Sequence, residues 1–250
     1  MKRWAFVILV LFTVTSTLAT AGCKRQAQKL VVGTSADYEP FEYVDSNGNY
    51  TGFDVELMQE IAKRTGTEIE WQDIAFDGLI GSLQTGKIDA IIAAMSATPE
   101  RQEQVDFTDT YFVGADAILV AEGSGAVINK NEDMAGYKIG VQTGTIQEDW
   151  ISQHLPDAEV SHYERAEQAI MDLKSGRIDV VAMDYYAATS FLNQGGSQLA
   201  LKTEFAGEHM AIAVKKGNTE LRDKFNTAIH ELEKEGFIEE LAMKYLTGGQ

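Results

Sequence analysis

The chain contains Ile80-Gly81-Ser82-Leu83-Gln84-Thr85-Gly86-Lys87-Ile88-Asp89 and, ninety residues later, Ile170-Met171-Asp172-Leu173-Lys174-Ser175-Gly176-Arg177-Ile178-Asp179. Each copy ends a helical pattern, turns at a glycine, and leads into an apolar run, Ala90-Ile91-Ile92 or Val180-Val181-Ala182. Glycine suits the left-handed residue that closes a helix, and a basic neighbour suits the negative helix end. The apolar runs are typical of short buried parallel strands. A helix–turn–strand unit used twice predicts two similar lobes.

The residues that follow the two apolar runs differ in charge. The first run leads to Ser96 and to Arg101, and the second leads to Asp184. In open α/β sheets, ligands bind outside the carboxyl ends of the strands. We therefore expect one lobe to offer a cation and the other an anion across a cleft.

Composition limits the class of protein. A chain of 250 residues can form one large domain or two modest ones. It has 38 acidic and 21 basic residues, a formal net charge of -17. This charge argues against nucleic acid or an anionic membrane surface as a partner, and we interpret it as a source of solubility.

The N-terminus has the pattern of a signal peptide over residues 1–22. Lys2 and Arg3 precede an apolar run from Trp4 to Val14, and small residues follow. The run is short for a membrane-spanning helix. We expect the mature protein to work outside the cytoplasm.

Cys23 is the only cysteine, so an intramolecular disulfide is impossible. It follows Thr20-Ala21-Gly22 and resembles the lipidated cysteine of bacterial lipoproteins, although Thr20 stands where that signal usually has an aliphatic residue. Ala19-Thr20-Ala21 also fits ordinary signal-peptidase cleavage. We expect lipidation at Cys23, an anchor that needs no transmembrane helix, and a short linker over residues 23–28.

Strand and helix patterns alternate along the rest of the chain, which predicts an α/β fold with parallel layers. A loop around Pro40 is expected at residues 34–43. We expect strands at 30–33, 68–73, 88–92, 139–141, 159–162, 179–183 and 211–214. We expect helices at 54–65, 76–85, from Pro99, from about 147, and at 165–174, 184–192, 219–234 and 237–245.

No catalytic constellation stands out in the sequence. The four histidines, at positions 154, 162, 209 and 230, lack the spacing of metal ligands, and there is no Walker-type phosphate loop. We therefore expect no metal, no cofactor and no enzymatic activity.

The first candidate for ligand binding is Arg101. An arginine in a Glu/Gln-rich helical turn is usually solvated, but this one lies near a predicted strand end, beside Ser96 and Thr98. A guanidinium can pair bidentately with a carboxylate. The turn Gly144-Thr145-Ile146 opens a helix, so its N–H groups could bind the same carboxylate, or it is an ordinary N-cap.

Asp184 and two aromatic residues complete the candidates. Asp184 is either the N-cap of the helix that follows or the partner of a ligand ammonium group. Tyr38 and Phe76 each follow a predicted strand. They are either core residues or a sandwich for a ligand side chain, with cation–π attraction if that side chain is charged.

Several longer segments add specificity when taken together. They are Gly52-Phe53-Asp54-Val55-Glu56-Leu57, Phe76-Asp77-Gly78-Leu79-Ile80, Thr98-Pro99-Glu100-Arg101, Val105-Asp106-Phe107-Thr108-Asp109-Thr110-Tyr111-Phe112, Gly140-Val141-Gln142-Thr143-Gly144-Thr145 and Ile178-Asp179-Val180-Val181-Ala182-Met183-Asp184. In this order they resemble the extracytoplasmic solute-binding proteins of ABC importers for polar amino acids, of the bacterial family 3 type, over residues 29–247.

The resemblance implies a two-lobed periplasmic-binding-protein fold, with a mostly parallel sheet flanked by helices in each lobe. It implies one lobe from residues 29–112 plus 210–250 and another from residues 113–209. Two hinge strands would cross near 112–114 and 209–210 and allow closure around a ligand. The implied partners are an amino acid and an ABC permease in the cytoplasmic membrane, with the binding protein itself a monomer.

The resemblance also implies roles for matching residues. Arg101, Ser96 and the amide of Ile146 would bind the ligand α-carboxylate. Asp184 and the carbonyl of Ala94 would bind the α-ammonium group. Tyr38 and Phe76 would hold the side chain, next to the turn at Thr145.

Three positions depart from the family pattern. Ser35 stands where several members carry an aspartate that contacts the ligand side chain. Ile146 replaces a frequent threonine and loses a hydroxyl. Ala94 replaces a common glycine or serine, which matters little if only its carbonyl is used.

The ligand expected from these residues is a basic amino acid, arginine first. An aromatic pair suits a guanidinium, and Asp37, Glu39 or Glu42 could place an acid near its tip. The loop at 35–42 resembles that of some arginine binders. Glutamine or another polar amino acid is the alternative in this class.

Two other functions fit the same fold. Some aromatic-acid dehydratases resemble it, but they need a cleft acid poised to protonate a leaving group, and no residue here is marked for that task. A ligand sensor would need a separate membrane partner, because the chain has no signalling domain of its own.

Overall fold

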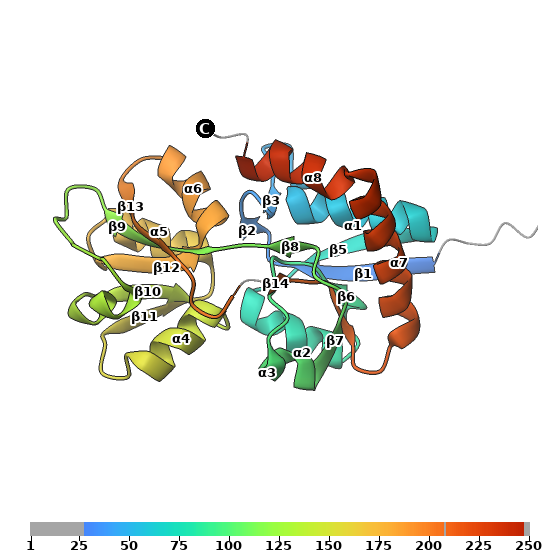
Figure 1. Cartoon of the computed structure of the whole chain (residues 1–250), viewed down its shortest axis with the longest axis horizontal. Coiled ribbons are helices and arrows are strands. Elements are labelled where there is room, and N and C mark those ends of the chain that lie inside the picture. The colour runs from blue at the N-terminus through green and yellow to red at the C-terminus, as the bar shows by residue number, and fades with distance from the viewer. Residues whose placement is uncertain (1–27, 208, 248–250) are drawn as a thin grey trace, which may run out of the picture.

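The computed structural model describes residues 28–207 and 209–247, which form two five-stranded sheets flanked by helices and two smaller sheets (Figure 1). The expected signal peptide, Cys23 and residues 24–27 of the expected linker lie outside the described residues, and Gln28, expected as the end of the linker, already belongs to a strand. Within the described part, no helix has both the length and the apolar character needed to cross a membrane.

The first lobe is built on a sheet with the order β5-β1-β6-β15-β7. Its strands are β1 (Gln28–Thr34), β5 (Thr67–Asp73), β6 (Ala90–Ile91), β7 (Val105–Phe107) and β15 (Ala213–Lys215). Alternate residues of the central strands enter two cores, one on each face of the sheet. The helical segments of this lobe are α1 (Phe53–Thr65), the 3-10 turn η1 (Phe76–Gly78), α2 (Leu79–Gln84), α3 (Pro99–Gln104), α7 (Thr219–Glu235), α8 (Phe237–Ala242) and the π turn η3 (Met243–Thr247).

The second lobe is built on a sheet with the order β11-β10-β12-β9-β13. Its strands are β9 (Asp116–Ala121), β10 (Ile139–Gln142), β11 (Val160–Tyr163), β12 (Val180–Asp184) and β13 (Ser197–Thr203). Two buried clusters again lie on its two faces. The helical segments are η2 (Asn131–Gly136), α4 (Ile146–His154), α5 (Ala166–Lys174) and α6 (Tyr185–Asn193).

Both sheets are mixed but mostly parallel, as the family resemblance implied, because only β15 in the first sheet and β9 in the second run against the other strands. β1 is parallel to β5 and β6, but β15 is antiparallel to β6 and β7. In the second lobe β10 is parallel to β11 and β12, but β9 is antiparallel to β12 and β13. The antiparallel strands β9 and β15 are the ones that the chain forms directly after passing between the lobes, so they enter their sheets from the hinge end.

Two short strands, β8 (Phe112–Val113) and β14 (His209–Met210), pair antiparallel and lie between the two large sheets (Figure 1). They stand where the sequence predicted the crossings. The segment expected as a loop at residues 34–43 contains β2 (Asp37–Tyr38) and the start of β3 (Glu42–Val44), joined through the cis peptide bond between Glu39 and Pro40. With β4 (Tyr50–Thr51), which lies beyond the expected loop, they form a three-stranded sheet.

The repeated sequence unit makes the same backbone contacts in both lobes. The Asp89 carboxylate accepts a hydrogen bond from the Val31 N–H at 2.9 Å, and the Asp89 N–H donates to the Val31 carbonyl at 2.7 Å. Asp179 makes the same pair of bonds with Lys138, both at 2.9 Å. Each aspartate therefore fixes its own strand against the neighbouring parallel strand.

The isoleucine before each of these aspartates is also used twice in the same way. Ile88 covers Gly33 of β1, and Ile178 covers Gly140 of β10, so closely that a side chain at either glycine would overlap the end of the isoleucine. The unit Ile-Asp therefore needs a glycine on the neighbouring strand, a long-range requirement that the two lobes share.

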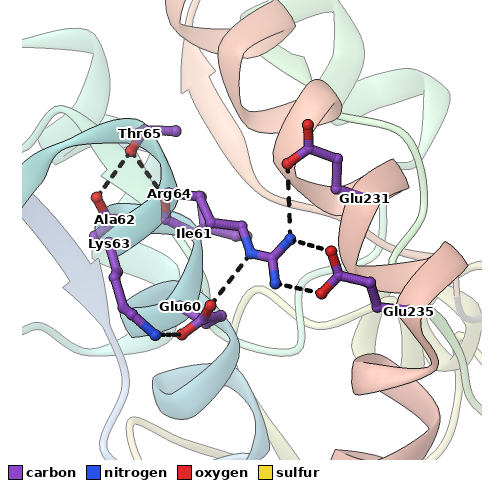
Figure 2. A network of polar contacts seen from close by, with 8 residues as sticks. All are labelled: Glu60, Ile61, Ala62, Lys63, Arg64, Thr65, Glu231 and Glu235. Atoms are coloured by element: carbon purple, nitrogen blue, oxygen red, sulfur yellow. Dashed lines mark hydrogen bonds and ion pairs between the residues drawn. The ribbon is translucent and has the colours of Figure 1, made fainter.

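Polar contacts attach helix α7 to α1 (Figure 2). Arg64 of α1 donates to both carboxylate oxygens of Glu235 and also to Glu60, and it lies 3.6 Å from Glu231. The segment after the second crossing thus returns to the first lobe and is held there by apolar packing and this bidentate ion pair.

Candidate ligand-binding site

A cavity lies between the two lobes, at the carboxyl ends of several strands. Ser35 follows β1, Ala94 follows β6, Gln142 ends β10 and Asp184 ends β12. The complete lining is Ser35, Tyr38, Glu42, Phe76, Ala93, Ala94, Ser96, Arg101, Gln142, Thr145, Ile146, Gln147 and Asp184. The cavity therefore gathers every residue that the sequence predicted for the site except Asp37 and Glu39.

Arg101 is the cationic group of this cavity, and only 7% of its surface is exposed. Thr98 caps the start of α3 by accepting from the Arg101 N–H at 3.3 Å. The guanidinium donates to the Ser96 carbonyl at 2.8 Å and to the Gly144 carbonyl at 2.9 Å. Since Gly144 belongs to the second lobe, Arg101 reaches across the cleft from the first.

The Arg101 guanidinium also lies over the ring of Phe76, 5.4 Å from its centroid. Phe76 begins η1 directly after β5 and packs against the core beneath α2. The aromatic face and the cation therefore form one wall of the cavity.

Asp184 is the anionic group supplied by the second lobe. One carboxylate oxygen accepts from the N–H groups of Tyr186 and Ala187, at 2.7 and 3.0 Å, so Asp184 is the N-cap of α6. The Asp184 N–H donates to the Tyr38 hydroxyl at 3.1 Å. The two interpretations of Asp184, helix cap and cavity anion, are thus compatible, because the side chain caps the helix and lines the cavity.

The turn at residues 144–146 opens α4 beside the cavity. Thr145 accepts from the Glu148 N–H at 3.3 Å and donates to the Gln142 carbonyl at 2.8 Å. The Gly144 N–H donates to the Glu148 carboxylate at 2.6 Å. Thr145 is therefore an N-cap as well as a lining residue, and Ile146 lines the cavity from the first turn of the helix.

A pair of buried carboxyl groups lies next to this site. Glu42 on β3 is 1% exposed, and Asp54 in the first turn of α1 is fully buried. One Asp54 oxygen accepts from the Ala94 N–H at 2.6 Å and from the Tyr111 hydroxyl at 2.9 Å. Burial raises the pKa of Asp54 to about 7 and the pKa of Glu42 well above its usual range.

Asp54 was not predicted as part of the site. The sequence could have indicated that Asp54 is buried, because Asp54 lies on the same helical stripe as Leu57, Met58 and Ile61, which are all buried. An acid on the apolar stripe of a helix needs a buried partner.

Ala94 has a left-handed backbone, with φ of 46°, and is the one non-glycine residue with positive φ in the described part of the chain. This conformation costs an alanine energy that a glycine avoids. The left-handed backbone at residue 94 explains why a glycine is suitable there. The sequence alone did not reveal this conformation.

Asp37 does not line the cavity, although we expected it to act on the ligand side chain. Its carboxylate accepts from the Ser35 hydroxyl at 2.9 Å, from Arg165 at 3.2 Å and from the Ala166 N–H at 2.9 Å. Arg165 also donates to Asp73 at 2.9 Å. Asp37 is therefore engaged by the N-terminus of α5, and it joins the lobes outside the cavity.

Three lining residues, Ala93, Gln142 and Gln147, were missed. Gln147 donates to the buried Asp116 at 2.5 Å, and Gln142 donates to the Glu164 carbonyl at 3.3 Å. A neutral side chain next to a predicted turn gives little indication in the sequence that it lines a binding site.

Among the described residues, no group of three or more histidine, cysteine or acidic residues could hold a metal ion.

Known proteins are similar to this chain in sequence and in fold. The family model for bacterial extracellular solute-binding proteins, family 3, matches residues 30–248. The arginine-binding extracellular protein ArtP of Bacillus subtilis is 38% identical over 99% of both chains.

Two solved structures are also similar to this chain. An ancestral arginine-binding protein bound to arginine is 40% identical, with a TM-score of 0.83 over 87% of this chain and 97% of that one. An ancestral arginine-binding protein bound to glutamine is 39% identical, with a TM-score of 0.84 over 90% and 100%. These similar proteins are binding proteins, not enzymes.

Proposed function

Because this chain belongs to the bacterial extracellular solute-binding proteins, family 3, we propose that it captures arginine between its lobes for an ABC importer. It is an amino-acid-binding protein that works outside the cytoplasm. The observation that carries the proposal is the placement of Arg101 and Asp184, one from each lobe, on the lining of one cavity.

Opposite charges on the two lobes suit the two charges of an amino acid. Arg101, with Ser96 and the amide of Ile146, binds the α-carboxylate. Asp184 and the Ala94 carbonyl bind the α-ammonium group. Closure removes water from both pairs, which strengthens them and makes any unpaired ligand group costly.

The charge balance of the lining favours a basic ligand. Glu42 and Asp184 supply two carboxyl groups against the single guanidinium of Arg101. When Glu42 is ionised in the complex, a ligand with a net positive charge compensates this difference. Tyr38 and Phe76 hold its side chain, and Ser35 stands at the position that we assign to side-chain selectivity.

Titration calorimetry with arginine, lysine, histidine, glutamine and citrulline tests the ligand class. We expect arginine to bind most tightly. Binding of glutamine without binding of any basic amino acid would show that the alternative ligand is correct and that the charge argument is wrong.

The carboxylate assignment has a separate test. Arg101→Ala should weaken arginine binding at least roughly 30-fold, because truncating one member of a buried charge pair costs about 2 kcal/mol or more. Arg177→Ala is the matched control, since Arg177 is 72% exposed and pairs with Asp172 within the second lobe. Equal affinities of the Arg101 variant and the wild type would contradict the assignment.

The remaining proposals concern the anchor and the partner. We propose that Cys23 is lipidated and tethers a monomeric binding protein near its permease in the cytoplasmic membrane. Mass spectrometry of the mature N-terminus tests the anchor: a diacylated or triacylated Cys23 supports it, and an unmodified chain that begins at Gly22 contradicts it.

A further inference from the structure

The Glu42 and Asp54 carboxyl groups are buried together without a basic partner. No ion pair joins either residue to a lysine, arginine or histidine among the described residues, and Glu42 Oε2 and Asp54 Oδ1 receive no hydrogen bond from a donor there. Two ionised carboxylates in this position would repel each other at low dielectric. The pair is therefore stable when it holds a proton between the two groups.

The hydrogen bonds indicate which member holds that proton. Asp54 already accepts from the Ala94 N–H and the Tyr111 hydroxyl, and both bonds favour its anion. No such donor contacts Glu42 in the described part of the chain, and its hydrogen bond with Asp54 raises its pKa. Glu42 is thus the protonated member and Asp54 the acceptor.

The groups around Glu42 place it at the ammonium end of the proposed site. Glu42 pairs with Tyr38 across β2 and β3, and the Tyr38 hydroxyl accepts from the Asp184 N–H. Burial raises the pKa of Glu42, and the charges of Asp54, Asp37 and Asp184 raise it further. Asp54 holds the backbone of Ala94, whose carbonyl is an assigned ammonium acceptor.

The other titratable groups near the pair are accounted for. The Tyr111 hydroxyl contacts Asp54, and the Glu42 charge also raises the pKa of Tyr111. Asp37 is compensated by Arg165, outside the cavity. Arg101 lines the same cavity and donates to the carbonyls of Ser96 and Gly144. Glu42 is therefore left as the lining acid that a ligand cation can ionise.

We propose that the Glu42–Asp54 pair holds a proton before the ligand binds and releases it to solvent when the α-ammonium group of an amino acid enters the cavity. The ammonium replaces the proton as the positive charge next to Glu42. This step rests on the proposed function, since it assumes that an amino acid binds here with its ammonium near Asp184. Its consequence is that amino-acid affinity rises with pH even though neither charge of the ligand itself changes between pH 5 and 7.

Calorimetry in buffers of different ionisation enthalpy measures the number of protons released on binding. At pH 6 we expect roughly one proton for arginine and also for citrulline, which has the same ammonium group and a neutral side chain. The dissociation constant should fall about tenfold per pH unit in the range where one proton is released. Release with arginine alone would place Glu42 at the side-chain end and overturn the proposal, as would release with neither ligand.

Glu42→Gln tests whether Glu42 is the residue that releases the proton, because the glutamine amide can still donate to Asp54 but does not ionise. This variant should bind both ligands without proton release. Glu39→Gln, an exposed position in the same turn, is the matched control and should release protons like the wild type.

An infrared measurement keeps the proposal testable even if the Glu42 variant does not fold. The wild type should show the C=O stretch of a protonated buried carboxyl group, and this band should disappear when the amino acid binds. A band that persists in the complex would contradict the proposal. Failure to bind arginine would count against the proposed ligand only, and the same measurements are then made with glutamine.

Discussion

The cluster formed by Arg165 with Ser35, Asp37 and Asp73 predicts that a residue outside the cavity controls ligand affinity. The Arg165 guanidinium joins the start of α5, in the second lobe, to three acceptors at the ends of β1 and β5 and in β2, in the first lobe. These contacts exist only when the lobes are together. Arg165→Ala should therefore destabilise the closed form without removing any lining residue of the cavity.

The size of the effect follows from the surroundings of each partner. Asp73 is 40% exposed, so its ion pair contributes about 0.5–1 kcal/mol. Asp37 is only 10% exposed, but burial raises its pKa, so the cost of removing its charge from water offsets much of the attraction. We expect a total of about 1–2 kcal/mol, which corresponds to a roughly 5- to 30-fold change in the ratio of closed to open forms.

Calorimetry and small-angle scattering measure the two sides of this prediction. The arginine dissociation constant of Arg165→Ala should rise roughly 5- to 30-fold, because only the closed form completes the site. The scattering radius of the ligand-free variant should be at least as large as that of the wild type. Arg177→Ala, on the same lobe, should change neither quantity. Wild-type affinity in the Arg165 variant would refute the reasoning, since the cluster would then contribute nothing to closure.

Three further changes test the fold and its titration. Arg64→Ala should lower the free energy of unfolding slightly, and by less in high salt, as measured by denaturant titration. A loss that does not depend on salt would contradict an ionic contribution. Gly140→Ala should lower the free energy of unfolding by about 1–3 kcal/mol, because the added methyl group meets Ile178. Gly81→Ala, in open space within α2, should raise it by about 0.5–1 kcal/mol. Equal changes in the two variants would show that packing at Gly140 is unimportant. Burial raises the pKa of Asp54 to about 7 from its ordinary value of 3.8, and Asp54 shares a proton with Glu42, so the buried pair stabilises the fold most below about pH 4 and loses this contribution as the pH rises through 7. Asp54→Asn should therefore flatten the pH dependence of unfolding in that window, and an unchanged curve would count against the raised pKa.

The sequence predicted the parts of the fold that depend on local pattern. The repeated unit ending in Asp89 and Asp179 identified two strands and the strand ends that carry Ser96, Arg101 and Asp184. These positions depend on helix ends, glycine turns and apolar runs, which short segments encode. Strand direction was less accessible, because the antiparallel entry of β9 and β15 depends on where the chain crosses between lobes.

The positions of Asp37 and Glu42 in the structure show which features of the site could not be predicted from the sequence. Both acids flank Tyr38 in one short loop, and both were candidates for the ligand side chain. The pairing of β2 with β3 sets Tyr38 opposite Glu42 and Asp37 opposite Tyr43. Glu42 enters the cavity, while Asp37 meets Arg165, a residue more than a hundred positions away whose approach depends on the arrangement of the lobes.

The position of β15 has a consequence for the order in which the chain can assemble during synthesis. The sheet of the second lobe uses strands between residues 116 and 203 only, so it can be completed from one continuous piece of chain. The sheet of the first lobe cannot, because β15 at residues 213–215 lies between β6 and β7. We therefore expect residues 116–203 to fold first as the chain is synthesised. The N-terminal part of the first lobe can complete its fold only after β15 and the two C-terminal helices have been made. A truncation before residue 213 would leave a folded second lobe attached to an unfinished first one.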